Sequence, residues 1–294
     1  MEDSFASAAA RFEEHYGWNI SPSVIRERTL HHARQSQELP KGPAPLPAAQ
    51  IITGLDGSMI PIMCPAPEGD RRKNKTLFWR EVRVAFARRE GEVTAHYGAT
   101  LDEALGAGLM WHETVELAGL NEQTKVHALG DGAPWILDQC DRQFGTRATF
   151  MVDLHHVSDY LAAAAPACTT TTEPWFEEQK ARLRQSQVQQ VLDELQAHQE
   201  PELKDSAGKT PPVRRAFGYI DQRQDHMDYR AALEAGLPIG SGEVESAHRH
   251  IVQARLKKAG AWWREPNAQV LLQMRTLRAN GRWQDYWKHI ASLN

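Results

Sequence analysis

Residues 125–161 read KVHALGDGAPWILDQCDRQFGTRATFMVDLHHVSDYL and alternate between two patterns. The stretch contains two short apolar runs that are typical of strands, and each ends at an aspartate, Asp131 or Asp153. A segment with helical spacing follows each run, and the first of these opens on Pro134, a residue favoured at the first position of a helix. The alternation of strand and helix predicts an α/β fold.

Three more strands are expected before this stretch. Residues 50–64, QIITGLDGSMIPIMC, are rich in β-forming residues and have a break at Asp56–Gly57. Residues 77–100, LFWREVRVAFARREGEVTAHYGAT, form two strand patterns joined at Glu90–Gly91, and a helix is expected over 101–118. This order of elements predicts a mixed sheet whose first three strands are antiparallel.

The segments outside this core differ in composition. Residues 1–38 carry two helical patterns around a turn, with Ser21–Pro22 as a helix start, which is the outline of a helix-turn-helix. Because two short helices occur in most proteins, this outline alone does not establish DNA reading. The other expected divisions are a proline-rich linker at 39–49, the core at 50–160, a helical insertion at 161–240 and C-terminal helices that complete the core at 241–294.

Composition excludes several classes of protein. Hydrophobic residues make up 41% of the chain and charged residues 24%, as in ordinary globular proteins. No stretch approaches the ~20 apolar residues of a membrane span, so no membrane partner is expected. The three cysteines are scattered, which favours a reducing cytoplasm over a disulfide framework. The net charge of −4 leaves nucleic acid open, because the basic residues are clustered.

Two aspartates stand out because a glycine follows each at a strand end. Asp56 and Asp131 could share hard divalent cations, and two ions about 4 Å apart stabilise both oxygens of a phosphodiester exchange. Each residue also has an ordinary interpretation. Asp-Gly is a common hairpin turn, and Asp131 could simply lead into a helix. Taken one at a time, the residues favour the ordinary interpretation, and composition and spacing do not reverse this.

Residues 236–250, GLPIGSGEVESAHRH, could supply a third carboxylate. The glycines and Ser241 precede a helix expected over 243–258. Glu243 and Glu245 point about 200° apart on this helix, so only one of them can face the aspartates. A glutamate in a first helical turn is also favourable by itself. Ser241 either caps the helix, or the glycines around it allow a close approach.

Five motifs, taken in order, carry a resemblance to a known family over about residues 45–290. They are LDGSMIPI, ALGDGAPWI, VDLHHVSDYL, GLPIGSGEVESAHRHIVQARLKKAGAWW and GRWQDYW. Together they resemble the bacterial insertion-sequence transposases of the ISKra type, in the DDE class. The resemblance implies an α/β fold: a ribonuclease H-like mixed sheet with a helical insertion between the last strand and the catalytic-glutamate helix.

The resemblance also implies a site and an activity. The catalytic and metal-binding residues would be Asp56, Asp131 and Glu245, holding two Mg²⁺ or Mn²⁺ ions, since Glu245 matches the fixed glutamate of the family pattern and Glu243 a variable position. The expected activity is cleavage and strand transfer at insertion-sequence ends, with DNA as partner, by a homo-oligomer in the cytoplasm at the nucleoid. The basic residues Arg249, Arg255, Lys257 and Lys258 would follow the phosphate backbone, although a solvated helix face is the ordinary interpretation.

Several alternatives remain at this point. Family members are typically longer at the N-terminus, so the chain could be a truncated or domesticated remnant that binds DNA without catalysis. A nuclease that cuts without strand transfer is a third hypothesis. Asp153 is expected to support the site, with a ligand role as its alternative. Residues 206–210, SAGKT, lack the pattern of a phosphate-binding loop, and Trp262–Trp263 either pack the helix end or stack on an unpaired base.

Overall fold

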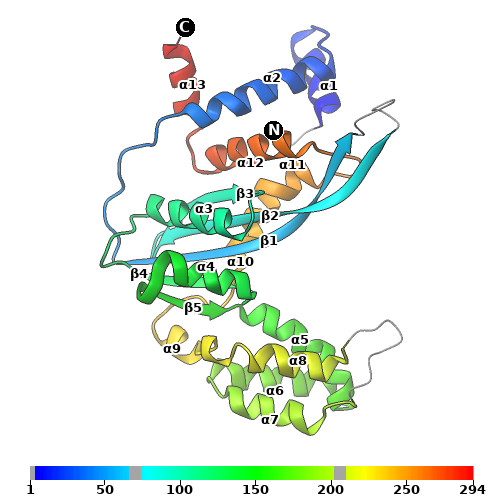
Figure 1. Cartoon of the computed structure of the whole chain (residues 1–294), viewed down its shortest axis with the longest axis vertical. Coiled ribbons are helices and arrows are strands. Elements are labelled where there is room, and N and C mark those ends of the chain that lie inside the picture. Colours follow the sequence, from blue (N-terminus) through cyan, green and yellow to red (C-terminus); the bar gives the residue numbers. More distant parts are fainter. Residues whose placement is uncertain (1–3, 66–73, 202–209, 294) are drawn as a thin grey trace. The chain divides into compact units, whose positions relative to one another are not determined.

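The computed structural model describes residues 4–65, 74–201 and 210–293 (Figure 1). Most of the described chain forms helices and strands. In chain order these are α1 (Phe5–Tyr16), α2 (Pro22–Gln35), η1 (Ser36–Glu38), β1 (Gln50–Pro65), β2 (Lys75–Arg89), β3 (Ala95–Thr100), α3 (Ala104–Leu117), β4 (Lys125–Gly130), α4 (Pro134–Phe144), η2 (Gly145–Arg147), β5 (Ala148–Val152), α5 (Leu154–Cys168), α6 (Thr172–Arg184), α7 (Val188–Ala197), α8 (Pro212–Asp221), η3 (Gln224–His226), α9 (Tyr229–Glu234), α10 (Gly242–Ala247), η4 (His248–Gln253), α11 (Ala254–Leu256), α12 (Glu265–Ala279) and α13 (Trp283–Ser292).

The strands form one mixed sheet of five, hydrogen-bonded in the order β3-β2-β1-β4-β5. β2 and β3 are antiparallel, with Phe86 opposite Tyr97. β4 and β5 are parallel, with Ala128 opposite Phe150. The parallel pair needs a crossover connection, and α4 provides it. The mixed α/β architecture predicted from the order of elements is therefore confirmed.

One local prediction about β1 was wrong. The strand does not break at Asp56–Gly57 but continues through both residues from Gln50 to Pro65. Gly57 lacks the positive φ that a hairpin turn of this kind requires. A β-carbon at Gly57 would come within 2.3 Å of the Glu81 side chain on β2, so the glycine makes room for Glu81 instead of forming a turn. Asp56 thus lies inside a strand.

The chain divides into two compact units. The first comprises Met1–Ile51, Leu55–Thr124 and Glu243–Asn294, and the second comprises Ile52–Gly54 and Lys125–Gly242. Strand β1 contributes to both, because its residues Ile52–Gly54 are grouped with β4 and β5. Asp56 and Glu245 belong to the first unit, and Asp131 and Asp153 belong to the second.

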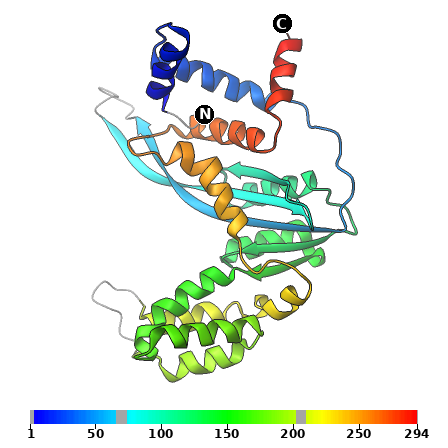
Figure 2. The same ribbon diagram turned by 180° about the vertical axis from the view of Figure 1, so that it is seen from behind.

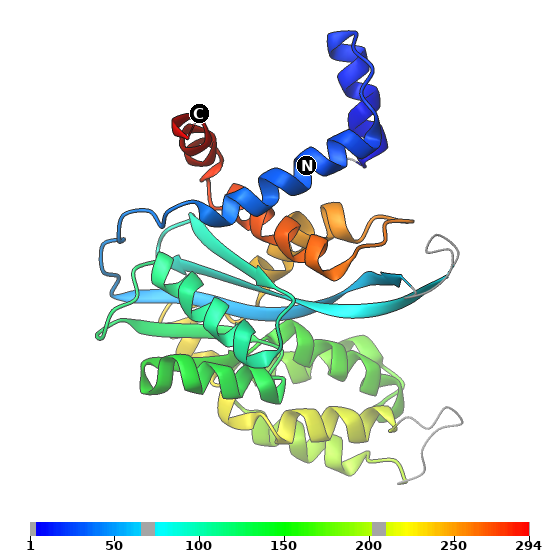
Figure 3. The same ribbon diagram turned by 45° about the horizontal axis from the view of Figure 1, so that its top comes forward.

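Helices cover both faces of β2 and β3 in the first unit (Figure 3). A β-carbon at Gly98 would meet the side chains of Met110 and Thr114, so this face of β3 lies against α3. The next residue, Ala99, is in the same core as Leu271 of α12. Because successive side chains of a strand point to opposite faces, α3 and α12 lie on opposite sides of the sheet.

The helix formed by α10, η4 and α11 lies against the strands of the first unit (Figure 2). Its apolar face shares one core with strands β1 to β3 and with helices α2 and α12. The buried members of this core are Leu30, Ala33, Ile60, Ile62, Val82, Val84, Ala99, Leu101, Ala247, Ile251, Val252, Leu256, Trp263, Ala268, Leu271, Leu272 and Met274. The core thereby holds the helix that carries Glu245 against the strand that carries Asp56.

Side chains of α12 and of the residue after it protect the edge of the sheet. β3 is the outermost strand of the order, and an outermost strand leaves main-chain groups unpaired. Asn280 accepts a hydrogen bond from Tyr97 N at 2.8 Å and donates one to Tyr97 O at 3.0 Å. Gln269 accepts from Leu101 N at 2.8 Å. These contacts also fix α12 along the strand.

The second unit joins β4 and β5 to a group of packed helices. α5 packs against α6 and α8, and α7 packs against the same two helices. Apolar side chains fill the space between them, among them Leu161, Trp175, Leu183, Val191, Leu195, Val213 and Ile220. The described part of 161–240 is thus helical, as the sequence predicts. Residues 206–209 of the SAGKT segment lie outside the described residues.

Two further expectations concern the helix ends. Ser21 caps α2 by accepting a hydrogen bond from Val24 N, and Pro22 occupies the first turn, as predicted. The long helix expected over 243–258 is instead Gly242–Leu256, and its middle, η4, is a π-helix. π-helical turns are rare in proteins, and those that occur are often found at functional sites.

The three cysteines give a direct test of this fold. All three thiols are free; Cys64 is exposed, whereas Cys140 and Cys168 are buried. Burial raises the pKa of Cys140 to about 12 and that of Cys168 to about 11. Because the thiolate is the reactive form, we expect a thiol reagent to modify Cys64 quickly and the other two only after unfolding. Mass spectrometry after brief labelling measures this, and equal labelling of Cys140 would contradict the structure.

Candidate functional site

Asp56 lies beside a buried histidine in the first unit. Its Oδ1 accepts a hydrogen bond from Gly57 N at 2.7 Å, and its Oδ2 lies 3.4 Å from His248 Nε2. His248 begins the π-helical segment and is only 3% exposed. Burial lowers the pKa of His248 to about 4, and this outweighs the opposite effects of the Asp56 main chain and of the Glu245 charge. The ring is therefore neutral near pH 7, and its contact with Asp56 is polar rather than ionic.

Glu245 is also a neighbour of His248. Its side chain is exposed and forms no hydrogen bond or ion pair with the residues that the structure describes. Its negative charge nevertheless acts on His248, whose pKa it raises. The His248 ring therefore lies 3.4 Å from the Asp56 carboxylate of β1 and also responds to the charge of Glu245 on α10. Sequence reasoning missed His248, because nothing in its spacing from other histidines indicates a site.

Glu243 differs sharply from Glu245, although only two residues separate them. Its Oε1 accepts a hydrogen bond from Arg88 Nε on β2 at 2.7 Å, which forms an ion pair. Arg88 is the more buried partner, so the pair joins the start of α10 to the sheet. Glu243 is thus engaged in holding the helix, while the Glu245 carboxylate remains available.

The pattern of buried residues explains this orientation. Val244, Ala247 and Ile251 are buried at helical spacing, as the sequence predicts. His248 and Val252 are buried as well, each one position after a member of that stripe. A π-helical turn widens the spacing between successive turns, so two adjacent positions can both face the core. This brings His248 inward, next to Asp56.

Asp131 directly follows β4 in the second unit, as predicted. Its Oδ1 accepts a hydrogen bond from Ala133 N at 2.8 Å, and its main-chain oxygen accepts one from the Tyr219 hydroxyl at 2.5 Å. Gly132 has a φ of 70° and accepts a hydrogen bond from Arg223 Nε at 2.8 Å. A β-carbon at Gly132 would meet the Arg223 side chain at 2.8 Å, so the space beside Asp131 is occupied by this arginine.

Two side chains fix this turn: Tyr219 lies on α8, and Arg223 lies just after the end of that helix. The Arg223 guanidinium lies 4.2 Å from the centroid of the Tyr219 ring, and Tyr219 stacks on Tyr160 at 4.0 Å. Burial raises the pKa of Tyr219, which Arg223 counteracts in part. The hydroxyl therefore stays protonated and donates to Asp131 O. The main chain at Asp131 is fixed by contacts from two side chains.

Asp153 is a structural carboxylate. It is completely buried and caps α5 by accepting a hydrogen bond from His155 N at 2.6 Å. Its other oxygen accepts hydrogen bonds from Ser241 N, at 2.9 Å, and from the Ser241 hydroxyl. Both carboxylate oxygens are therefore occupied by donors of the protein itself. This arrangement favours the expected supporting role over a role as a ligand.

The same contacts explain the Gly-Ser-Gly segment before α10. The Ser241 hydroxyl donates to Asp153, so Ser241 anchors the segment to the start of α5. A β-carbon at Gly240 would lie 3.0 Å from His155 Cδ2, which is tighter than normal packing. Of the two interpretations of this segment, close approach fits Gly240, and anchoring describes Ser241 better than helix capping.

The three predicted carboxylates offer only oxygen ligands, which suits Mg²⁺ or Mn²⁺. Asp56 and Glu245 share a neighbour in the first unit, and Asp131 is held on its own turn in the second. Within residues 4–65, 74–201 and 210–293, no three Asp, Glu, His or Cys side chains come close enough to form a metal-binding group. The oxygen donors suit the ion, but the structure does not bring the three residues together as one described group, so the triad remains a prediction.

The four predicted DNA-contacting residues divide into two kinds. Arg249, Lys257 and Lys258 are exposed. Arg255 is only 5% exposed, and its guanidinium lies 4.4 Å from the ring centroid of Phe5 and 4.6 Å from that of Trp263. Its position between two rings makes Arg255 a packing residue, so only the other three side chains present their charges to solvent.

No helix among the described residues is long and apolar enough to cross a membrane.

The burial of His248 predicts how the stability of the protein depends on pH. His248 has a pKa of about 4 in the folded protein and an ordinary value of 6.5, so the unfolded chain takes up its proton first. Its contribution to stability is complete above pH 6.5 and is lost as the pH falls toward 4. Asp56 and Glu245 oppose this shift, and Lys257 adds to it.

Between pH 7.5 and 5, we expect the free energy of unfolding of the metal-free wild type to fall by about 2 kcal/mol more than that of a His248→Gln variant. Urea unfolding in EDTA at the two pH values measures the difference. His250→Gln, at an exposed position of the same segment, is the control. Parallel pH curves for wild type and His248→Gln would show that His248 is not buried in its neutral form.

Comparisons with known proteins identify a family. No curated protein matches the chain. Among solved structures, "Crystal structure of NurA with manganese" is 12% identical, with 90% of this chain and 65% of that chain covered and a TM-score of 0.13, too low to support an argument. The model of the Uncharacterised protein family (UPF0236) matches residues 112–288, more than half of the chain. The match includes Asp131, Asp153 and Glu245, and the chain therefore belongs to the Uncharacterised protein family (UPF0236).

Proposed function

We propose that this chain is the catalytic part of a DDE-class DNA transposase with a ribonuclease H-like core. It would cut a phosphodiester at the end of an insertion sequence and join the freed 3′-OH to target DNA. Both steps are phosphoryl transfers at one site, on DNA in the cytoplasm at the nucleoid. Since two element ends must be joined, we propose at least a dimer on DNA.

The observation that carries the proposal is the difference between Glu243 and Glu245. Arg88 forms an ion pair with Glu243, whereas Glu245 is exposed and its charge acts on the same histidine that lies 3.4 Å from Asp56. The resemblance to insertion-sequence transposases points to Glu245 on independent grounds. The mixed sheet, with its antiparallel β2–β3 and parallel β4–β5 pairs, is compatible with the proposed core.

Each residue has a definite task in this proposal. Asp56, Asp131 and Glu245 would hold Mg²⁺ or Mn²⁺, which supplies an activated water and neutralises charge on the phosphate. Gly57 N orients the Asp56 carboxylate, and Ala133 N orients that of Asp131. Preformed orientation matters because phosphoryl transfer depends on positioning and charge stabilisation.

Three exposed cations support DNA binding beside this site. Arg249, Lys257 and Lys258 follow Glu245 on the same helix and just beyond its end. Cationic side chains of this kind contact phosphates and fix the register of a protein on DNA without reading its sequence. Their loss should weaken binding for all sequences alike and reduce its dependence on salt.

The second candidate is a remnant that binds DNA without cutting it. It is favoured by the exposed cations, which need no metal site to act. An assay with DNA that carries the flanking terminal repeats and Mg²⁺ or Mn²⁺ separates the candidates. Nicked and joined products support the transposase, nicked products alone indicate a nuclease, and binding without products identifies the remnant. Products that are equally abundant in EDTA would contradict the proposed metal chemistry.

A further inference from the structure

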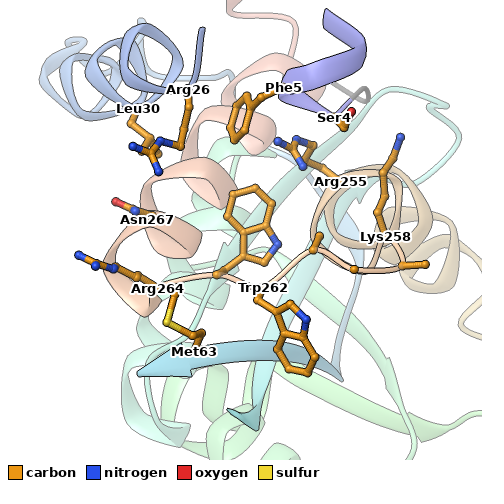
Figure 4. A pocket seen from close by; sticks show the side chains of 14 residues that line it. Ser4, Phe5, Arg26, Leu30, Met63, Arg255, Lys258, Trp262, Arg264 and Asn267 are labelled. Carbon is orange, nitrogen blue, oxygen red and sulfur yellow. The ribbon is translucent and has the colours of Figure 1, made fainter. Parts of the chain in front are cut away.

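A pocket of about 410 Å³ lies in the first unit, outside the carboxylate site (Figure 4). Its size is within the ~300–1,000 Å³ typical of ligand pockets. α1, α2, β1, the loop 257–264 and α12 all contribute to its lining. The described lining residues include four cations, Arg26, Arg255, Lys258 and Arg264, and no acidic residue. The pocket is therefore suited to an anion.

The loop that forms the floor of the pocket is fixed to β1. Met63 N donates a hydrogen bond to Trp263 O at 2.7 Å, and Trp263 N donates one to Pro61 O at 3.3 Å. Trp263 is 7% exposed and points into the core, and its Nε1 donates to Leu256 O. Neighbouring side chains of a bridged, extended segment point in opposite directions. Trp262 accordingly is 40% exposed and lines the pocket.

The cations of the pocket differ in availability. Arg255 is stacked between Phe5 and Trp263, so it stabilises the packing of the pocket lining and is not available to a ligand. Lys258 and Arg264 are exposed and form no ion pair with the described residues. Figure 4 shows Lys258 on one side of the pocket and Arg264 on the other, with Arg26 on the Arg264 side. Negative charge could thus be bound from two directions.

An exposed indole and available cations in the lining of one pocket are the chemistry that recognises an unpaired nucleotide. Proteins that bind single-stranded nucleic acid combine a basic surface with aromatic rings on which bases stack. An acidic peptide or inorganic phosphate would use the cations but would leave the Trp262 ring without a planar partner. Paired bases are stacked within the duplex and would not offer a face to the ring.

We propose that this pocket binds one unpaired nucleotide of a DNA strand. Its base stacks on Trp262, and its flanking phosphates contact Lys258 and Arg264. The inference rests on the proposed function in taking DNA as the partner, but it needs no metal and no cleavage. It assigns to the first unit a binding site for DNA that is locally single-stranded, separate from the three carboxylates.

The test measures the binding of a short fluorescein-labelled oligothymidylate to the whole chain in EDTA, by fluorescence anisotropy. We expect Trp262→Ala to weaken binding roughly 5- to 150-fold, the range found when alanine replaces a base-stacking ring. We expect Lys258→Gln to reduce the slope of log Kd against log salt by about 0.7, the value for one phosphate contact on a single strand. Circular dichroism checks that both variants are folded.

The matched control is Trp287→Ala on α13, which removes an indole that is 38% exposed outside the pocket. It should bind the oligonucleotide like the wild type. A duplex of the same sequence should bind to wild type and Trp262→Ala with similar affinity. Equal losses for single strand and duplex would overturn the proposal, and so would an unchanged affinity of Trp262→Ala.

Competitors distinguish the sources of the ligand. Thymidine monophosphate should compete much less well than the oligonucleotide. Equal potency per nucleotide would show that the ligand of the pocket is a free nucleotide and not a DNA strand. Oligoglutamate should not compete at equal charge concentration, and displacement would indicate an acidic peptide site instead. Since every measurement is made in EDTA, absence of cleavage in the metal assay refutes the proposed function without affecting this result.

Discussion

Replacing Glu245 by glutamine is expected to reduce metal-dependent nicking of DNA by about 10³-fold or more, whereas Glu243→Gln stays close to wild type. A metal-coordinating carboxylate contributes several kcal/mol to transition-state stabilisation, and each 1.36 kcal/mol is a tenfold change in rate. Glutamine keeps the size of the side chain but removes the charge that would hold the ion under the proposed function. The measurement is the initial rate of nicking with Mn²⁺ at saturating DNA.

Glu243→Gln is the matched control, because it makes the same change two residues away. It removes the charge that pairs with Arg88, and a partly exposed pair of this kind contributes only about 1 kcal/mol or less to stability. The unfolding temperature of both variants should therefore stay near that of wild type. If Glu243→Gln lost activity and Glu245→Gln kept it, the assignment of the two glutamates would be reversed.

Removal of the Asp153 carboxylate is expected to cause the largest loss of stability. Asp153→Ala leaves Ser241 N–H and its hydroxyl without their acceptor in a buried position and removes the cap of α5. An unsatisfied buried donor costs about 1–3 kcal/mol, and a lost cap about 1 kcal/mol. We expect the free energy of unfolding to fall by roughly 3–5 kcal/mol, as measured by urea denaturation.

Asp159→Ala is the control for this change, since Asp159 lies on the same helix and is exposed. It should alter stability by less than about 0.5 kcal/mol. Asp153→Asn should fall between the two, because the amide oxygen still accepts one hydrogen bond while its NH₂ group faces a donor. A stable Asp153→Ala variant would show that the Gly-Ser-Gly segment is not anchored at α5.

The elements that depend on local sequence were predictable. β4, α4, β5 and α5 were each expected from short apolar runs and from Pro134, and the structure has all four. The positions of Asp131 and Asp153 just after their strands followed directly. The alternation of strands and helices depends on the pattern of neighbouring residues, so it can be predicted without knowledge of tertiary contacts.

The features that depend on distant residues were not predictable. Asp56–Gly57 carries a turn signal, yet the strand continues, because Gly57 accommodates Glu81 from the next strand. The pairing of Glu243 with Arg88 joins residues 155 positions apart. Nothing in the local pattern of the glutamates indicates such a partner. The preference for Glu245 came from the resemblance alone, and the structure adds the contrast between the two environments.

The same reason explains His248 and Arg255. The spacing of His248 from the other histidines indicates no site, but the π-helical turn brings it next to Asp56. Arg255 was grouped with the exposed cations of its helix, although Phe5, 250 residues away, covers it. Burial at these positions depends on packing between distant segments, which periodicity alone does not encode.

The proposed function requires Asp131 and Glu245 to act together in one metal-dependent reaction. The most direct test is a strand-joining assay with terminal-repeat DNA and Mn²⁺, on wild type, Asp131→Asn and Glu245→Gln. Asparagine keeps the acceptor for Ala133 N, so the turn stays intact while the charge is lost. We predict joined products for wild type, none in EDTA, and none for either variant although both still bind the DNA. Joined products from either variant at the wild-type rate would contradict the proposed triad.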